Sequence, residues 1–165
     1  MTDAFSKGAC LAVVKKDFNV LGIPEHRLIR VHEPLFVFGQ MAKIHKQLFT
    51  VKTIAITGSV GKTTTKEILN NILDVRFKTL ANEKNFNNLI GLPKTIFNLN
   101  SDHHFLIVEL GTNHFGEIKR LSQICSPDVA CVTNVGLAHT EFFEDIEGVW
   151  KEKRDIFSAL SKSGK

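Results

Sequence analysis

The sequence predicts an α/β fold in which a mostly parallel sheet is flanked by helices. From residue 51 onward, short apolar runs alternate with helical patterns, as in chains built from βαβ units. A turn rich in glycine, T-G-S-V-G-K-T-T-T-K-E at 57–67, joins one apolar run to one helical pattern, so the sheet is of the P-loop type. The 165 residues, 43% of them hydrophobic, suffice for about one domain with a core.

The expected elements follow one another along the chain. Residues 1–33, with strand-like runs at 9–14 and 28–31, are too short for a domain and are expected to be the tail of one. Pro34 opens a helix marked by Val37, Met41, Ile44 and Leu48. Strands are expected at 52–57, 76–80, 104–110 and 128–133. Helices are expected at 63–73, with Ile68, Leu69, Ile72 and Leu73 on one face, at 89–99, at 117–125 and at roughly 146–161.

The composition narrows the class of partner. The net charge is +4, but lysine and arginine are scattered among acidic residues, which favours a phosphorylated small molecule over nucleic acid. Cys10, Cys125 and Cys131 form no C-x-x-C pair, so neither a disulfide framework nor a zinc site is indicated. No leader pattern and no apolar run of about 18 residues occurs, so we expect a cytoplasmic chain without membrane insertion.

The turn at 57–67 has the residues that a phosphate-binding loop needs. Gly58 and Gly61 would let backbone N–H groups approach an anion, and the helix starting near Thr63 would add unpaired donors and its dipole. In the motif G-x-x-x-x-G-K-[ST], Lys62 would neutralise the β- and γ-phosphates and Thr63 would bind Mg²⁺. The first glycine of that motif falls on Ile56, so an ordinary strand-to-helix turn stays open as the alternative.

Polar side chains follow two other strands. Glu109 ends an apolar run and is placed to complete a Mg²⁺ site, because ligands of parallel sheets lie beyond the carboxyl ends of strands; a solvated glutamate is the alternative. Asn134 and His139 follow the strand at 128–133, and a lone histidine is more often structural or exposed than functional. The loop asparagines read on physical grounds as caps and turn residues; they are Asn82, Asn85, Asn87 and Asn88.

Lys153 is the least expected residue of the last helix. An apolar stripe is formed, at about 100° per residue, by Ile146, Val149, Trp150, Phe157 and Leu160. Lys153 falls in the middle of this stripe, while Lys151, Glu152, Arg154 and Asp155 lie off it. The lysine either extends its ammonium to the surface or presents an amine of altered pKa to a site.

Taken together, these motifs resemble the Mur ligase family, and within it the MurF type. The loop at 57–67 is similar to the nucleotide loop of that family, in which the Thr-Gly opening and the missing first glycine are normal. Further blocks similar to those of the family follow in the same order: N-F-N-N-L-I-G-L-P at 85–93, E-L-G-T-N-H-F-G-E-I at 109–118, T-N-V-G-L-A-H at 133–139 and K-R-D-I-F at 153–157.

The resemblance implies roles for individual residues. ATP would be bound by Thr57, Gly58, Ser59, Val60, Gly61, Lys62, Thr63, Thr64 and Asn134. Mg²⁺ would be held by Thr63, Glu109, His139 and Lys153, the lysine as a carbamate, and Lys62, Lys153 and His139 would be catalytic. Asn85, Asn88, Asn113 and His114 would lie near the phosphates or the muramyl peptide.

The family's reaction implies the function. ATP would activate the carboxylate of UDP-MurNAc-tripeptide as an acyl phosphate, and the amine of D-alanyl-D-alanine would then displace phosphate in peptidoglycan precursor synthesis. Residues 1–33 would be a remnant of the N-terminal UDP-sugar-binding domain and 34–165 a partial central ATP-binding domain, with the C-terminal domain absent or supplied by a companion chain. Two alternatives stay open: a truncated, non-catalytic nucleotide-binding module, and another Mur or folylpolyglutamate synthase-type ligase.

Overall fold

The computed structural model describes residues 2–83, 85–136, 145–160 and 164. They form two compact units that are divided between Phe38 and Gly39. The predicted α/β class with parallel strands and flanking helices is confirmed. None of the helices in the described ranges has the length and apolar character that a membrane crossing requires.

The first unit is a small parallel pair of strands. It contains α1 (Thr2–Ser6), β1 (Ala12–Lys15), the 3-10 turn η1 (Glu25–Arg27) and β2 (Leu28–Val31). The strands pair in parallel from Ala12 with Leu28 to Lys15 with Val31. Arg27 ties the unit together, because its guanidinium donates to the carbonyls of Ala9 (2.6 Å) and Cys10 (3.0 Å).

The second unit is built on a parallel sheet of four strands in the order β4–β5–β3–β6. Its strands are β3 (Lys52–Thr57), β4 (Thr79–Ala81), β5 (Phe105–Glu109) and β6 (Val129–Val132). Because all four run in one direction, their carboxyl ends lie along one edge of the sheet. The strand predicted at 76–80 begins later, because the preceding helix reaches Asp74 and the chain then turns before Thr79 pairs with Phe105.

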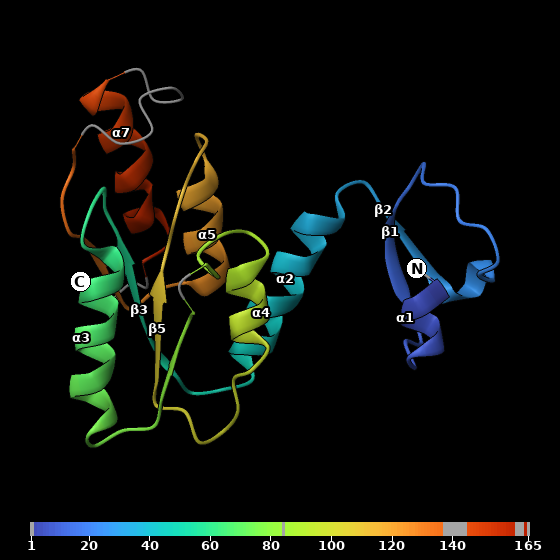
Figure 1. The fold of residues 1–165 in the computed structure, drawn as a ribbon, viewed down its shortest axis with the longest axis horizontal. Coiled ribbons are helices and arrows are strands. Elements are labelled where there is room, and N and C mark those ends of the chain that lie inside the picture. The colour runs from blue at the N-terminus through green and yellow to red at the C-terminus, as the bar shows by residue number, and fades with distance from the viewer. Residues whose placement is uncertain (1, 84, 137–144, 161–163, 165) are drawn as a thin grey trace. The chain divides into compact units, whose positions relative to one another are not determined.

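Helices cover both faces of this sheet. They are α2 (Pro34–Gln47), α3 (Lys62–Asp74), α4 (Gly91–Ile96), α5 (Glu117–Cys125) and α7 (Ile146–Lys153), which continues into the 3-10 segment η2 (Arg154–Ala159). In Figure 1, α3 lies on one side of β3 and β5, and α4 and α5 lie on the other. Between the sheet and α4, α5 and η2 lies a core that includes Leu92, Ile96, Leu106, Val108, Leu121 and Ile156. The helix predicted at 89–99 is shorter than expected, since it begins at Gly91 and ends at Ile96.

The helices expected before and after β3 are confirmed, but most of the apolar side chains that predicted them are exposed. The exposed members are Met41, Ile44, Leu48, Ile68 and Ile72. Helix α2 instead packs through Gly39 and Ala42, and a Cβ at Gly39 would come within 2.6 Å of Ile124 Cδ1. The buried residue of α3 is Lys66. In α2, close approach through small residues therefore replaces the expected apolar contact, whereas α3 buries a lysine.

The last helix differs from the single α-helix predicted at roughly 146–161. It ends at Lys153 and tightens into 3-10 turns, so the stripe drawn at one fixed angle breaks. Lys153 is 3% exposed, which favours an amine turned toward a site over an ammonium extended to the surface. Ile146, Trp150 and Phe157 of the stripe are 40–49% exposed. The interpretation that Glu152 lies off the buried face is wrong, because this residue is 1% exposed.

Candidate functional site

The phosphate-loop sequence forms the turn between β3 and α3. Gly61 has a φ of +84° and precedes the first helical residue, Lys62, without a side-chain cap. Gly58 has a φ of +151°, and a Cβ there would lie 1.9 Å from the Thr133 hydroxyl oxygen. Both glycines are thus required by the backbone path, and the start of α3 presents backbone N–H groups suited to an anion.

The segment after β6 closes over this loop. The Thr133 hydroxyl donates to Val60 O (2.7 Å), and Asn134 Oδ1 accepts from the backbone N–H groups of Ser59 (3.1 Å) and Val60 (2.9 Å). Ser59 Oγ bonds with the backbone of Gly136 in both directions. The structure therefore brings Asn134 to the loop through two strand ends that are neighbours in the sheet.

Glu109 lies beside the first turn of α3. Its Oε2 accepts from the Thr63 hydroxyl (2.6 Å) and its Oε1 accepts from Asn87 Nδ2 (3.0 Å). The carboxylate is 3% exposed, and no described residue forms a salt bridge with it. A buried anion held only by neutral donors is suited to a cation, and the hydroxyl and carboxylate oxygens of Thr63 and Glu109 are the ligand type that Mg²⁺ prefers.

A cavity of about 200 Å³ lies next to Glu109 and is lined in part by its neighbours Asn87 and Leu110. It is lined by Lys62, Asn87, Asn88, Leu110, Gly111, Thr112, Asn113, Glu117 and Lys153. The Lys62 ammonium donates to Gly58 O (2.7 Å), so it lies within the phosphate loop. The structure thus brings together the loop lysine, the lysine of α7 and two of the four predicted substrate residues.

Lys153 presents an amine of altered acidity to the cavity. Burial, and to a smaller extent the nearby charge of Lys62, lower its pKa to about 8, while the charge of Glu152 acts in the opposite direction. No hydrogen bond from the ammonium to another described residue is found. A much larger fraction of free amine is therefore present near neutral pH than for an exposed lysine.

The other predicted site residues are distributed differently. Asn85 lies at a separate hollow of about 160 Å³ next to α4. His114 is exposed, and its Nδ1 lies 3.7 Å from Glu117 Oε1. Thr57 turns its hydroxyl away from the loop, donating to Leu110 O (2.9 Å), and Thr64 is exposed on α3. His139 lies outside the described residues. Among the described residues, no three His, Cys, Asp or Glu side chains gather as a metal site.

Asn88 has the capping role that physical reasoning gave to the loop asparagines. Its Oδ1 accepts from the backbone N–H groups of Ile90 (3.0 Å) and Gly91 (2.9 Å) at the start of α4. The same residue lines the cavity. Both interpretations of Asn88 are therefore compatible with its position.

Glu152 was missed as a site residue. Its Oε1 accepts from the Thr112 hydroxyl (3.0 Å) and Ile118 N (2.8 Å), and its Oε2 accepts from Gly116 N (2.6 Å). This buried carboxylate caps the start of α5 and holds the segment that carries Asn113 and His114. Its place next to Lys153 was the only sign in the sequence that Glu152 belongs to the site. A glutamate within a run of charged residues is otherwise expected to be exposed to solvent.

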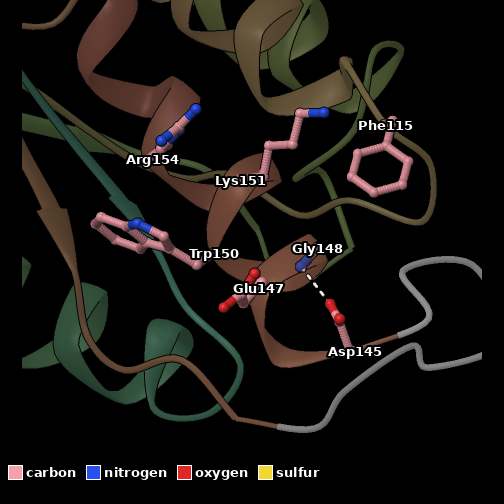
Figure 2. A pocket seen from close by; sticks show the side chains of 7 residues that line it. All are labelled: Phe115, Asp145, Glu147, Gly148, Trp150, Lys151 and Arg154. Carbon is pink, nitrogen blue, oxygen red and sulfur yellow. Dashed lines mark hydrogen bonds between the residues drawn. The ribbon is translucent and has the colours of Figure 1, made fainter.

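A larger cavity, of about 600 Å³, lies beside α7. Figure 2 shows its lining residues, which are Phe115, Asp145, Glu147, Gly148, Trp150, Lys151 and Arg154. Asp145 caps α7 by accepting from Gly148 N (2.7 Å), the dashed line of Figure 2. None of the predicted site residues within the described ranges lines this cavity. The smaller cavity, where charged groups converge on the phosphate loop, is therefore the candidate site.

Comparison with known families decides the class of protein. The model of the Mur ligase middle domain matches residues 56–165. The chain belongs to the Mur ligase family. Two curated relatives, from Rickettsia prowazekii (38% identical) and Bacillus subtilis (35% identical), are both named UDP-N-acetylmuramoyl-tripeptide–D-alanyl-D-alanine ligase. Each match covers 98% of this Mur ligase chain and 35% of the relative, so the chain spans about a third of the length of these relatives.

Solved structures give the same result. This Mur ligase chain superposes on MurF from Acinetobacter baumannii with a TM-score of 0.90 at 32% identity, over 99% of this chain and 35% of that chain. It superposes on the MurF ligase of Thermotoga maritima in complex with ADP with a TM-score of 0.89 at 31% identity, over 99% of this chain and 37% of that chain. The predicted resemblance to the Mur ligases, and to the MurF type among them, is confirmed.

Proposed function

We propose that this chain carries the ATP-binding and carboxylate-activating site of a ligase that joins D-alanyl-D-alanine to UDP-MurNAc-tripeptide. One observation carries the proposal: Glu109 accepts from Thr63 of the phosphate loop, beside a cavity that Lys62 and Lys153 line together. The name of the curated relatives and the ADP bound in the Thermotoga maritima structure support it. Residues 1–33 are proposed to belong to the UDP-sugar-binding domain and residues 34–165 to the central ATP-binding domain.

The phosphate loop would bind ATP through its backbone. The N–H groups at the start of α3 would bind the phosphate oxygens, and Lys62 would leave Gly58 O to contact the β- and γ-phosphates. Asn134 would remain at the rim of the loop, where its carboxamide already orders Ser59 and Val60. Positioning and charge neutralisation are the main contributions that a protein makes to phosphoryl transfer.

Thr63 and Glu109 would hold Mg²⁺, and the predicted His139 would complete that set. Bound Mg²⁺ supplies charge neutralisation across the transferring phosphoryl group. The oxygen of the peptide carboxylate would attack the γ-phosphorus, forming an acyl phosphate and releasing ADP. The amine of D-alanyl-D-alanine would then attack the acyl carbon, forming the amide and releasing phosphate and a proton.

Lys153 would act as a carbamate. Its free amine, favoured by the pKa of about 8, would add to CO₂ and lose a proton, so that a cation becomes an anion. An anion at this position would be attracted both to the adjacent Lys62 and to a divalent cation.

Transfer of oxygen tests this reaction directly. In an enzyme of the relatives' length that contains these residues, the terminal peptide carboxylate would be labelled with ¹⁸O. Each phosphate released during ligation should carry one ¹⁸O atom, because a carboxylate oxygen bridges carbon and phosphorus in the acyl phosphate. Amide formation with unlabelled phosphate would contradict the proposal, and turnover of a folate substrate in place of the tripeptide would favour the rival ligase class.

A further inference from the structure

Asn82 makes an unusual set of contacts at the end of β4. It is 2% exposed, and its carboxamide brackets the backbone of Glu109: Oδ1 accepts from Glu109 N (2.8 Å) and Nδ2 donates to Glu109 O (3.0 Å). Nδ2 also donates to Phe86 O (3.0 Å). The last backbone pair between β4 and β5 joins Ala81 to Ile107, so the side chain of Asn82 extends the ladder to the residue that carries the carboxylate.

Lys66 fixes Asn82 from the other side. It is 1% exposed and is among the largest fully buried side chains of the protein. Its ammonium donates to Asn82 O and lies 3.0 Å from Glu67 Oε1. A buried ammonium is costly unless it is paired, and these two contacts supply that pairing. Lys66 lies one helical turn beyond Lys62 and Thr63 on the same helix, which runs alongside β5 in Figure 1.

We propose that Lys66 and Asn82 are positioning residues that hold the Glu109 carboxylate in register with the phosphate loop and so set the affinity of the divalent-cation site. The inference rests on the proposed function, because it assigns a role toward the cation that Thr63 and Glu109 would bind. The physical reason is that a metal site tolerates little displacement. Its ligand atoms must be held within about 0.5 Å of the binding geometry by groups that are themselves fixed.

The residues that contact the Glu109 carboxylate are themselves held in place by Lys66 and Asn82. The Glu109 side chain is bonded to Thr63 on the phosphate-loop helix and to Asn87 on the loop after β4. Asn82 holds the backbone of that loop at Phe86, and Lys66 connects Asn82 to the helix. Loss of either residue would thus loosen both side-chain partners of the carboxylate relative to each other.

Thr79 provides the matched control. Its hydroxyl bonds to Asn70 Oδ1 (2.8 Å) and Asp74 Oδ1 (3.0 Å), so it also joins β4 to α3, but at the opposite end of the strand from Glu109. Thr79→Val removes this connection and keeps the shape of the side chain. This variant therefore shows how much a general loss of contact between β4 and α3 changes the Mn²⁺ affinity of the site.

The experiment is a Mn²⁺ titration of the 165-residue chain, followed by electron paramagnetic resonance, with saturating ADP and in bicarbonate-free buffer. Asn82→Ala and Lys66→Met should each weaken Mn²⁺ binding by about tenfold or more, the usual effect of removing a group that orients a metal ligand. ADP binding measured in EDTA should stay within about twofold of the wild type, and Thr79→Val should leave Mn²⁺ binding unchanged. Lys66→Met keeps the aliphatic length of the side chain, so this variant still tests the proposal if Asn82→Ala does not fold.

A double-mutant cycle with Glu109→Gln separates positioning from general packing. If Asn82 acts through Glu109, Asn82→Ala should cost nothing further in Mn²⁺ affinity once the carboxylate is gone. Additive losses, or equal losses in Thr79→Val, would overturn the inference while leaving the proposed function intact. A wild-type chain that binds ADP but no Mn²⁺ would overturn the cation site itself, and with it both proposals.

Discussion

Replacing Lys153 with methionine and following stability against pH tests the electrostatics of the site. The pKa of Lys153 is lowered from 10.5 to about 8 by burial and by Lys62, so folding is penalised whenever the amine is protonated in both states. A difference of between two and three pKa units corresponds to about 3 kcal/mol. This penalty is complete below pH 8 and disappears as the pH rises through the folded pKa toward the unfolded value, because the unfolded chain then binds more protons.

The free energy of unfolding of the wild type, measured by urea denaturation in CO₂-free buffer, should therefore rise relative to Lys153→Met between pH 7 and 10.5, by up to about 3 kcal/mol. The comparison cancels contributions from other groups, such as Cys125, whose pKa is raised to about 12 by burial and whose effect on stability has the opposite sign. The difference in packing between lysine and methionine does not depend on pH, so it cancels from the slope. Parallel curves for the two proteins over this range would refute the reasoning.

Three further outcomes are expected. Gly58→Ala should destabilise the fold by at least about 1–3 kcal/mol in urea denaturation, because the new Cβ meets the Thr133 hydroxyl and φ is positive; an unchanged midpoint would mean that the turn adopts another path. Glu152→Gln should cost about 1.5–3 kcal/mol, since an acceptor of backbone N–H groups becomes a donor, whereas the exposed Glu147→Gln on the same helix should stay within about 0.5 kcal/mol. In an enzyme of the relatives' length, activity should fall when bicarbonate is removed and recover when it is restored, and Lys153→Arg should stay inactive; normal turnover of that variant would exclude the carbamate.

The order of the elements and the residues of the phosphate loop could be predicted from the sequence because both depend on local signals. Apolar runs of strand length and a glycine-rich turn before a helix are set by backbone geometry, which neighbouring residues encode. Strand ends that are far apart in the sequence then converge because parallel strands share an edge. That rule predicted a site position for Glu109 without any knowledge of side-chain contacts, whereas the nucleotide role of Asn134 was implied only by the family resemblance.

Burial of polar residues could not be predicted in the same way. Glu152 and Lys66 are buried because backbone groups from distant segments, Ile118 N and Asn82 O, supply their partners. Nothing in the local sequence encodes those partners. Helix α2 failed as a guide to burial for a related reason: its small residues face the core, where close packing matters more than hydrophobicity.

Titration calorimetry of the 165-residue chain with Mg-ATP tests most directly whether the loop between β3 and α3 binds the phosphates of ATP. Lys62→Ala should weaken binding by at least about 1–2 kcal/mol, the scale of a lost charge-assisted contact. Lys78→Ala, which removes an exposed lysine at the opposite edge of the sheet, should bind as the wild type does. Equal affinities of the wild type and Lys62→Ala, or no binding by the wild type, would contradict the account.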